Sequence, residues 1–171
     1  MHARGNIYAR ILFFTSMINE EAKLQQYIKK HNIPGEHKHY SKTLHSVQDL
    51  LQATGLPLEQ ISKTMIFIAE DGSTIAALVP AMFRVSSSKL AAALEQSVRF
   101  ATPEEVYERT GYPIGGMPCF GFECTLLADP RIFEQEYIYT GGGSEFSITK
   151  LPTSEIKKWA IIKKIRGKKS N

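Results

Sequence analysis

A lysine stands just before a continuous apolar segment of the chain. Lys63 precedes the run Met65–Ala69, whose continuous apolar character is typical of a strand buried on both faces. In that place a lysine can hold a positive charge at the mouth of a cleft, or it can keep its ammonium in water beside the strand. Taken alone, the position favours the second interpretation, so Lys63 needs support from other features before it becomes a candidate for chemistry.

Two glycine-rich segments could supply backbone donors to a ligand. The twelve residues 110–121 contain four glycines and two prolines, and residues 141–143 are three consecutive glycines. Paired glycines allow close backbone approach, and successive N–H groups turned to one point can stabilise an oxyanion. The composition equally fits a plain connector at 110–121 and a hairpin turn at 141–143. It fits neither a P-loop nor a dinucleotide-binding fingerprint.

Histidine and cysteine give weaker signals. His37 and His39 would share one side of a strand, but no neighbouring Cys or acid completes a zinc set. Cys119 could act as a nucleophile only if a histidine base approached it from elsewhere in the fold. Cys119 and Cys124 would face opposite ways along one strand, which favours neither a disulfide nor a shared metal. We therefore expect no metal and no cofactor.

The positive charge is concentrated at the C-terminal end. The 171 residues carry 21 Lys and Arg and 17 Asp and Glu, a net charge of +4, and seven of the basic residues lie within 157–169 without an acid. This tail is either a solvated extension or a phosphate-binding appendage with salt-dependent affinity for nucleic acid. The length fits one domain, and no apolar run approaches the roughly 18 residues of a membrane span. Two cysteines indicate a reducing, cytoplasmic environment.

Periodicity and capping residues predict a single α/β (α+β) domain with a mixed, barrel-like sheet of about six to seven strands flanked by helices. Residues 1–16 are expected to be an N-terminal extension that adds a strand or covers the surface, 17–156 the domain itself, and 157–171 a basic C-terminal helix and tail. The helices are expected at 18–31, at 46–55, from Ser87 or Ser88, at 103–110, and from Thr153 or Ser154 to Ile165. The strands are expected at 65–69, 74–79, 98–101, 122–128, 136–140 and 145–151, with 36–45 as a loop or an edge strand.

The order of these segments resembles the YbaK family of aminoacyl-tRNA deacylases, which is related to the editing domain of bacterial prolyl-tRNA synthetases. The resemblance runs from about residue 18 to 156. It rests on Ser-Lys-Thr-Met-Ile-Phe at 62–67, Phe-Ala-Thr-Pro-Glu-Glu-Val at 100–106, Thr-Gly-Tyr-Pro-Ile-Gly-Gly-Met-Pro at 110–118, Asp129, and Thr-Gly-Gly-Gly at 140–143.

The resemblance implies hydrolysis, in trans, of an amino acid wrongly esterified to the terminal adenosine of tRNA. The key lysine of the family falls on Lys63, and its Gly-x-x-x-Pro loop begins at Gly115. The fifth position of that loop is Cys119 here, and a proline stands one residue earlier at Pro118, so the preferred amino acid is open. The implied substrate-binding residues are Thr64, Gly115, Gly116, Met117, Pro118, Cys119, Gly121, Gly141 and Gly142.

The remaining expectations concern partners. The tail would meet the tRNA backbone through Lys163, Lys164, Arg166, Lys168 and Lys169. An aminoacyl-tRNA synthetase is a further candidate partner, and no membrane association is expected. Two alternatives stay open: a module that binds aminoacyl-tRNA or RNA without turnover, and a thiol-dependent protein built on Cys119.

Overall fold

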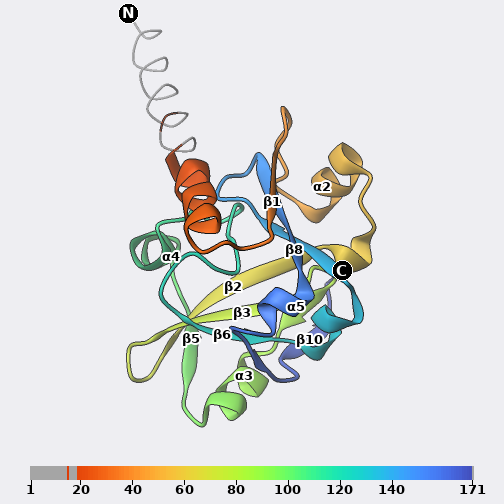
Figure 1. Cartoon of the computed structure of the whole chain (residues 1–171). Coiled ribbons are helices and arrows are strands. Elements are labelled where there is room, and N and C mark those ends of the chain that lie inside the picture. Colours follow the sequence, from red (N-terminus) through yellow and green to blue (C-terminus); the bar gives the residue numbers. More distant parts are fainter. Residues whose placement is uncertain (1–14, 16–18, 171) are drawn as a thin grey trace, which may run out of the picture.

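The computed structural model describes residue 15 and residues 19–170 (Figure 1). The predicted N-terminal extension lies outside the described residues apart from Thr15. A helix covers residues 19–30, in agreement with the predicted helix at 18–31. The other elements are β1 (Glu36–His39), α2 (Val47–Thr54), β2 (Ser62–Ala69), β3 (Thr74–Pro80), β4 (Phe83–Val85), α3 (Ser87–Leu94), β5 (Val98–Phe100), α4 (Pro103–Thr110), β6 (Thr125–Ala128), β7 (Tyr137–Gly141), β8 (Ser147–Pro152), α5 (Thr153–Ile156), β9 (Ile161–Ile162) and β10 (Arg166–Lys169), with short 3-10 turns at Leu58–Gln60 and Pro130–Glu134.

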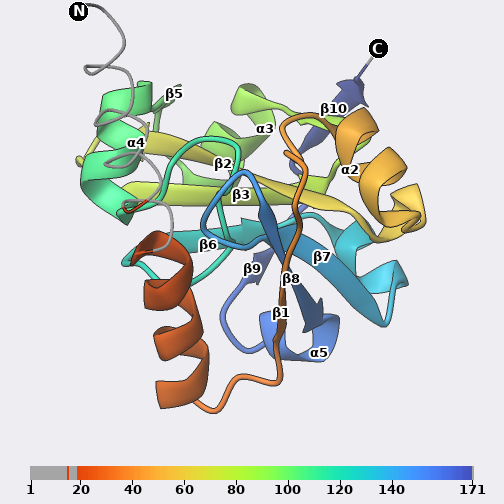
Figure 2. The ribbon, with the colours of Figure 1, turned by 90° about the horizontal axis from the view of Figure 1, so that it is seen from above.

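A five-stranded mixed sheet in the order β5-β2-β3-β6-β9 forms the centre of the molecule. β2 and β3 are antiparallel neighbours because Gly72, at φ +85°, closes the tight turn between them. β6 and β9 then add parallel strands. A three-stranded sheet, β1-β8-β7, lies against one face of the five-stranded sheet (Figure 2), and β10 and β4 form a separate hydrogen-bonded pair. The mixed α+β class and the single domain are thus confirmed, but the described strands form separate sheets and no closed barrel.

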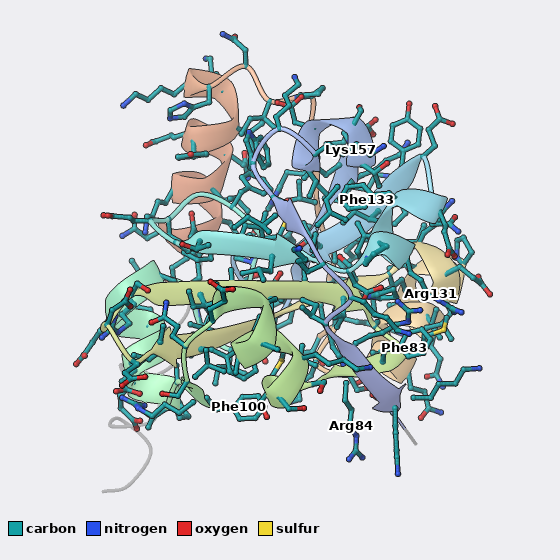
Figure 3. All side chains as sticks on the ribbon, turned by 90° about the horizontal axis from the view of Figure 1, so that it is seen from below. Phe83, Arg84, Phe100, Arg131, Phe133 and Lys157 are labelled. Atoms are coloured by element: carbon teal, nitrogen blue, oxygen red, sulfur yellow. The ribbon has the colours of Figure 1, made fainter. Side chains whose placement is uncertain are left out.

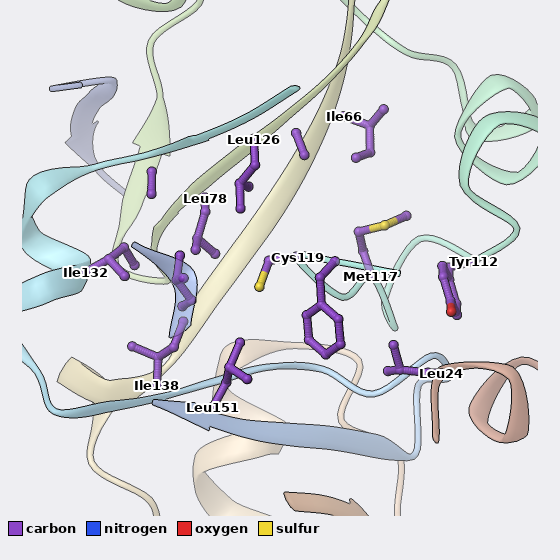
Figure 4. Close-up of a cluster of buried hydrophobic side chains, with 14 of the residues drawn as sticks. Leu24, Ile66, Leu78, Tyr112, Met117, Cys119, Leu126, Ile132, Ile138 and Leu151 are labelled. Atoms are coloured by element: carbon purple, nitrogen blue, oxygen red, sulfur yellow. The ribbon is translucent and has the colours of Figure 1, made fainter. Parts of the chain in front are cut away.

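Apolar side chains fill both faces of the central sheet. The larger cluster joins Leu78 and Leu126 of the five-stranded sheet to Ile138 and Leu151 of the three-stranded sheet (Figure 4). The smaller cluster, on the opposite face, includes Phe67, Ile75 and Val79 together with Leu90 of α3 and Ile165. Each such side chain contributes roughly 1.5–3 kcal/mol when it is fully buried. Ile66 of β2 lies in the larger cluster, so these two successive residues, Ile66 and Phe67, face different cores.

The C-terminal region differs from the prediction. The helix expected to reach Ile165 ends at Ile156, and residues 166–169 form β10, which pairs antiparallel with β4. The physical reason is burial: Ile165 is fully enclosed in the smaller cluster, and a helix continuing from Ile156 would not pair Ile161 and Ile162 with β6. The basic residues of the predicted tail are therefore part of the folded domain.

Candidate active site

A pocket of about 320 Å³ opens where β2 loses its neighbouring strand. β2 pairs with β5 only from Phe67 to Ala69, and it meets β7 through a single bridge between Ile61 and Tyr139. The odd-numbered residues of β2 bond to β3, so the N–H and C=O of Thr64 face the open edge. The pocket is mostly apolar and is lined by Leu44–Val47, Leu50, Ile61–Ile66, Ala81, Phe100, Ala101, Val106, Ile114, Gly115, Met117, Tyr139–Gly141, Ser147 and Ile148.

The two glycine-rich segments meet at this pocket and form one of its walls. The Gly143 amide donates to the Gly116 carbonyl at 2.8 Å. A Cβ atom on Gly116 would collide with the Ser144 backbone, and one on Gly141 would collide with the Met117 carbonyl. Within the described part of the chain, the amides of Gly115 and Met117 have no hydrogen-bond acceptor. Both segments are therefore more than connectors, because their close contact presents bare amides beside the pocket.

Lys63 borders the pocket, and its ammonium lacks an acidic partner. Lys63 Nζ donates to Ser170 Oγ at 3.2 Å, and the ion pairs of the described residues give it no carboxylate. Burial, and then the positive charge of Arg84, lower the pKa of Lys63 below its ordinary value. A partly buried lysine beside an arginine is a favourable place for an anion, since an anion relieves both effects.

Two buried threonines add hydroxyl groups to the pocket. Thr64, expected from the sequence, and Thr140, which was missed as a site residue, both border it. Their Oγ1 atoms are buried and have no hydrogen-bond partner. Thr140 belongs to one of the segments that carry the resemblance, but a threonine before three glycines also fits an ordinary strand end.

Cys119 is buried in the protein core. Its exposed fraction is 1 %, and Figure 4 places it within the larger apolar cluster, near Met117. Burial raises the pKa of the thiol to about 12, so the thiolate needed for nucleophilic attack is scarce at neutral pH. This position argues against the thiol-dependent alternative.

The other predicted substrate-binding residues stand behind the pocket surface. Gly116, Pro118, Cys119, Gly121 and Gly142 do not line the pocket. Gly121 faces Leu24 and the Tyr112 ring instead, and Gly142 lies against Ser147. Lys63, Thr64, Gly115, Met117 and Gly141 are the predicted residues that the structure brings together there.

The basic residues of the C-terminal region divide into two groups. Lys163, Lys164, Lys168 and Lys169 are exposed. Arg166 is instead bound by the fully buried Asp129, with 2.6 Å between Nη1 and Oδ1. Arg131 and Arg166 lie 5.1 and 5.7 Å from the ring of Phe83 in β4, and Figure 3 shows Arg84 projecting away from the ribbon beside it. β10 leads to Ser170, whose hydroxyl accepts the hydrogen bond from Lys63, so this basic surface ends at Lys63.

His37 and His39 both hydrogen-bond to one acidic residue. Both rings bond the buried carboxylate of Glu21, each at 3.1 Å, and the Ser144 hydroxyl donates to the same carboxylate. Burial alone would raise the pKa of Glu21, but the hydrogen bonds from Ser144, His37 and His39 lower it overall. The described residues contain no group of three or more potential metal ligands. The cluster therefore supports the backbone behind the glycine wall.

Known proteins with the same architecture point to one family. A family model described as an aminoacyl-tRNA editing domain matches residues 41–159. The proline–tRNA ligase of Thermotoga neapolitana is 33 % identical over 98 residues, which are 57 % of this chain and 17 % of the ligase. That of Fervidobacterium nodosum is 30 % identical over 112 residues, which are 64 % of this chain and 19 % of the ligase. This chain thus spans less than a fifth of the length of these relatives.

Solved structures share the fold. The crystal structure of "a putative trans-editing enzyme for prolyl tRNA synthetase" superimposes with a TM-score of 0.78 at 22 % identity, covering 86 % of this chain and 97 % of that one. A hypothetical protein gives a TM-score of 0.79 at 24 % identity, covering 85 % and 99 %. No helix among the described residues is long and apolar enough to cross a bilayer. On the match over residues 41–159, the chain belongs to the aminoacyl-tRNA editing domain family.

Proposed function

We propose that the protein hydrolyses the ester bond between an amino acid and the terminal adenosine of a mischarged tRNA. The observation that carries this proposal is the pocket at the open edge of β2, where the unpaired cation of Lys63 and the bare amides of Gly115 and Met117 border one hollow. The family of the chain supports the choice of ester. An aminoacyl-tRNA synthetase as a partner of this protein stays a prediction.

The chemistry needs no strong nucleophile, because an aminoacyl ester is already activated. Water adds to the ester carbonyl, the tetrahedral oxyanion collapses, and the ribose hydroxyl leaves with a proton, which gives the free amino acid and tRNA. We expect the amides of Gly115 and Met117, which border the pocket without an acceptor, to receive the oxyanion, and one preorganised donor of that kind contributes about 10²–10³ in rate. The buried Cys119 supports direct attack by water over a thioester intermediate.

The charges around the pocket suit the polyanionic part of the substrate. Lys63 would hold a phosphate of the terminal nucleotides, since its ammonium has only the Ser170 hydroxyl as a hydrogen-bond partner among the described residues. Lys168 and Lys169 are exposed on β10, directly before Ser170. We expect the tRNA backbone to contact this strand while its aminoacylated 3′ end enters the pocket.

Mischarged tRNA tests this function directly. We expect the wild-type protein to release the amino acid from at least one of Ala-, Ser-, Cys- and Pro-charged tRNAs. Lys63→Ala should lower kcat/KM about 10–10²-fold, the effect of losing one hydrogen bond between charged groups. Lys63→Arg should recover part of the loss because it keeps the charge. Lys38→Ala removes an exposed cation on β1, outside the pocket, and serves as the matched control.

Two outcomes would contradict the proposal. If the wild-type protein binds these tRNAs with strong salt dependence and hydrolyses none faster than buffer, it is a binding module without turnover. If Lys63→Ala and Lys38→Ala lower the rate equally, Lys63 has no special role in the reaction.

A further inference from the structure

The hydroxyl groups of Thr64 and Thr140 are buried and unpartnered in a mostly apolar pocket. The two residues have exposed fractions of 7 % and 1 %, and both line the pocket from neighbouring strands, β2 and β7. Neither Oγ1 atom has a hydrogen-bond partner. The Cys119 thiol lies close to Thr140, but sulfur is a weak hydrogen-bonding group. Because buried polar groups are nearly always satisfied, a bound group with hydrogen-bonding atoms is expected between the walls that carry them.

The surroundings show which kind of group fits. No Asp or Glu lines the pocket, so a deeply placed ammonium would lack a counter-charge. A deeply placed carboxylate would lose its hydration among apolar side chains, since Lys63 is held by Ser170 at the edge. A hydroxyl group is neutral, and it can donate to one threonine oxygen and accept from the other. A neutral hydroxyl therefore matches this pair of threonines better than either charged group.

The position of Thr140 shows which part of the substrate would carry that hydroxyl. Thr140 is almost fully buried beside Cys119 of the larger core, whereas Lys63 lies at the exposed side with Ser170. If Lys63 holds a phosphate, the deep end is left for the side chain of the amino acid.

We propose that Thr64 and Thr140 are specificity-determining residues that select a small hydroxylated side chain, that of serine or threonine, over alanine or valine. This inference rests on the proposed hydrolysis of aminoacyl-tRNA. Serine differs from alanine, and threonine from valine, essentially by the hydroxyl group, so each pair isolates its contribution. A site that hydrogen-bonds a substrate hydroxyl can strongly reject the analogue that lacks it, by 10⁴-fold or more in favourable cases.

Wild-type protein gives the first test and needs no variant. The kcat/KM for deacylation is measured on one tRNA acceptor charged in turn with serine, alanine, threonine and valine. We expect serine to exceed alanine, or threonine to exceed valine, by at least about tenfold, and the larger ratio identifies the preferred side chain. If alanine and valine are hydrolysed as well as their hydroxylated counterparts, the inference is wrong while the proposed function stands. If no ester is hydrolysed, the proposed function itself fails.

Three matched variants locate the effect. Thr140→Val and Thr64→Val delete one hydroxyl each, and each should reduce the preference for the hydroxylated substrate about tenfold. Thr149→Val is the control: Thr149 lies opposite Thr140 on β8, is fully buried and has an equally unpartnered hydroxyl, but does not line the pocket. The Thr149→Val protein should prefer the hydroxylated substrate as strongly as the wild type does. Thermal unfolding of all three variants would report any loss of folding.

The variants also separate side-chain recognition from a role in holding the attacking water. A threonine that positions this water would act on every ester. Equal losses for serine and alanine in Thr140→Val, with folding intact, would therefore overturn the inference and assign the hydroxyl to the water instead.

Discussion

The junction around Asp129 and the pocket beside β2 use similar groups in opposite ways. At the junction, the buried Asp129 carboxylate accepts hydrogen bonds from the backbone amides of Arg131, Ile165 and Arg166 at 3.0–3.1 Å and from the Arg166 guanidinium at 2.6 Å. In the pocket, the Lys63 ammonium lacks a carboxylate among the described residues, and two buried hydroxyls have no partner. The first region is complete in the folded chain, and the second leaves its polar groups for the proposed substrate.

This contrast separates structural charges from those available to a substrate. The sequence predicted Arg166 as a tRNA-binding residue and Lys63 as the key lysine of the family, yet Arg166 fixes β10 against the loop after β6. A buried charge that is fully hydrogen-bonded stabilises its surroundings only while all partners are present. Thus, net charge along the sequence is a poor guide to which residues face a ligand. A better guide is whether each charged group already has an oppositely charged partner within the fold.

The largest expected effect is on stability, at the junction. Asp129→Ala leaves the Arg166 guanidinium and three amides without their acceptor, so the free energy of unfolding should fall by about 3–5 kcal/mol. Urea denaturation monitored by tryptophan fluorescence measures the change. Asp71→Ala, which removes an exposed turn carboxylate bonded to Ser73, should cost less than about 1.5 kcal/mol. If the two variants lose the same free energy of unfolding, the hydrogen bonds of Asp129 contribute no more to stability than those of an exposed turn.

A second prediction concerns the wall of the pocket. Gly141→Ala places a methyl group against the Met117 carbonyl, so the two glycine segments must separate and the amide of Met117 must move. We expect kcat/KM for deacylation to fall about 10²-fold, since a displacement of about 1 Å at a reaction centre has an effect of this size. The initial rate on mischarged tRNA is the measurement.

Gly35→Ala is the control for Gly141→Ala. Its new methyl group would meet only side-chain atoms at 3.4 Å or more, at a backbone conformation open to other residues. It should leave the rate close to that of the wild type. Normal activity in Gly141→Ala would mean that the contact between the two glycine segments is not needed for the reaction.

Local signals in the sequence predicted much of the fold correctly. Thr102 and Glu105 form the expected capping box of α4, with Pro103 in its first turn and Gly111 ending it in the left-handed region. Ser46 caps α2 in the same way, together with Asp49. These elements depend on side chains within four residues of each other, so the sequence contains most of the information that determines them.

The C-terminal strand was missed because long-range contacts determine it. Residues 157–169 have no alternation of polar and apolar side chains, and the helical propensity of their lysines favoured a helix. Ile165 reaches the smaller core, and Asp129 accepts the two amides of Ile165 and Arg166 from 36 and 37 residues away. Partners at that separation cannot be recognised from one sequence without its structure.

The candidate site was predicted in part for the same reason. Lys63, Thr64 and Gly115 were found because they fall within short recognisable segments. Thr140 was missed as a site residue, because its significance comes from an unsatisfied hydroxyl and the position of β7 beside β2. A motif can therefore identify a loop, but the state of each polar group is visible only in the fold.

The smallest predicted effect sharpens the comparison at the mouth of the pocket. Arg84 is a second cause, after burial, of the lowered pKa of Lys63, and the described residues provide no carboxylate that counters it. If activity needs the protonated ammonium, the rate falls as the pH rises through this lowered pKa. Arg84→Gln removes the repulsion and raises the pKa of Lys63, so the alkaline fall in kcat/KM should move to higher pH.

The pH profile of deacylation, corrected for spontaneous ester hydrolysis, measures this shift. Lys38→Gln also removes one positive charge, but from exposed β1, and it should leave the alkaline limb in place. A shift of the alkaline limb to lower pH in Arg84→Gln would contradict the repulsion between Arg84 and Lys63. Identical profiles for both variants and the wild type would mean that a group other than Lys63 sets the limb. In contrast to Asp129, whose hydrogen-bond partners all lie within the chain, Lys63 would then show no effect of the charge of Arg84 on the reaction.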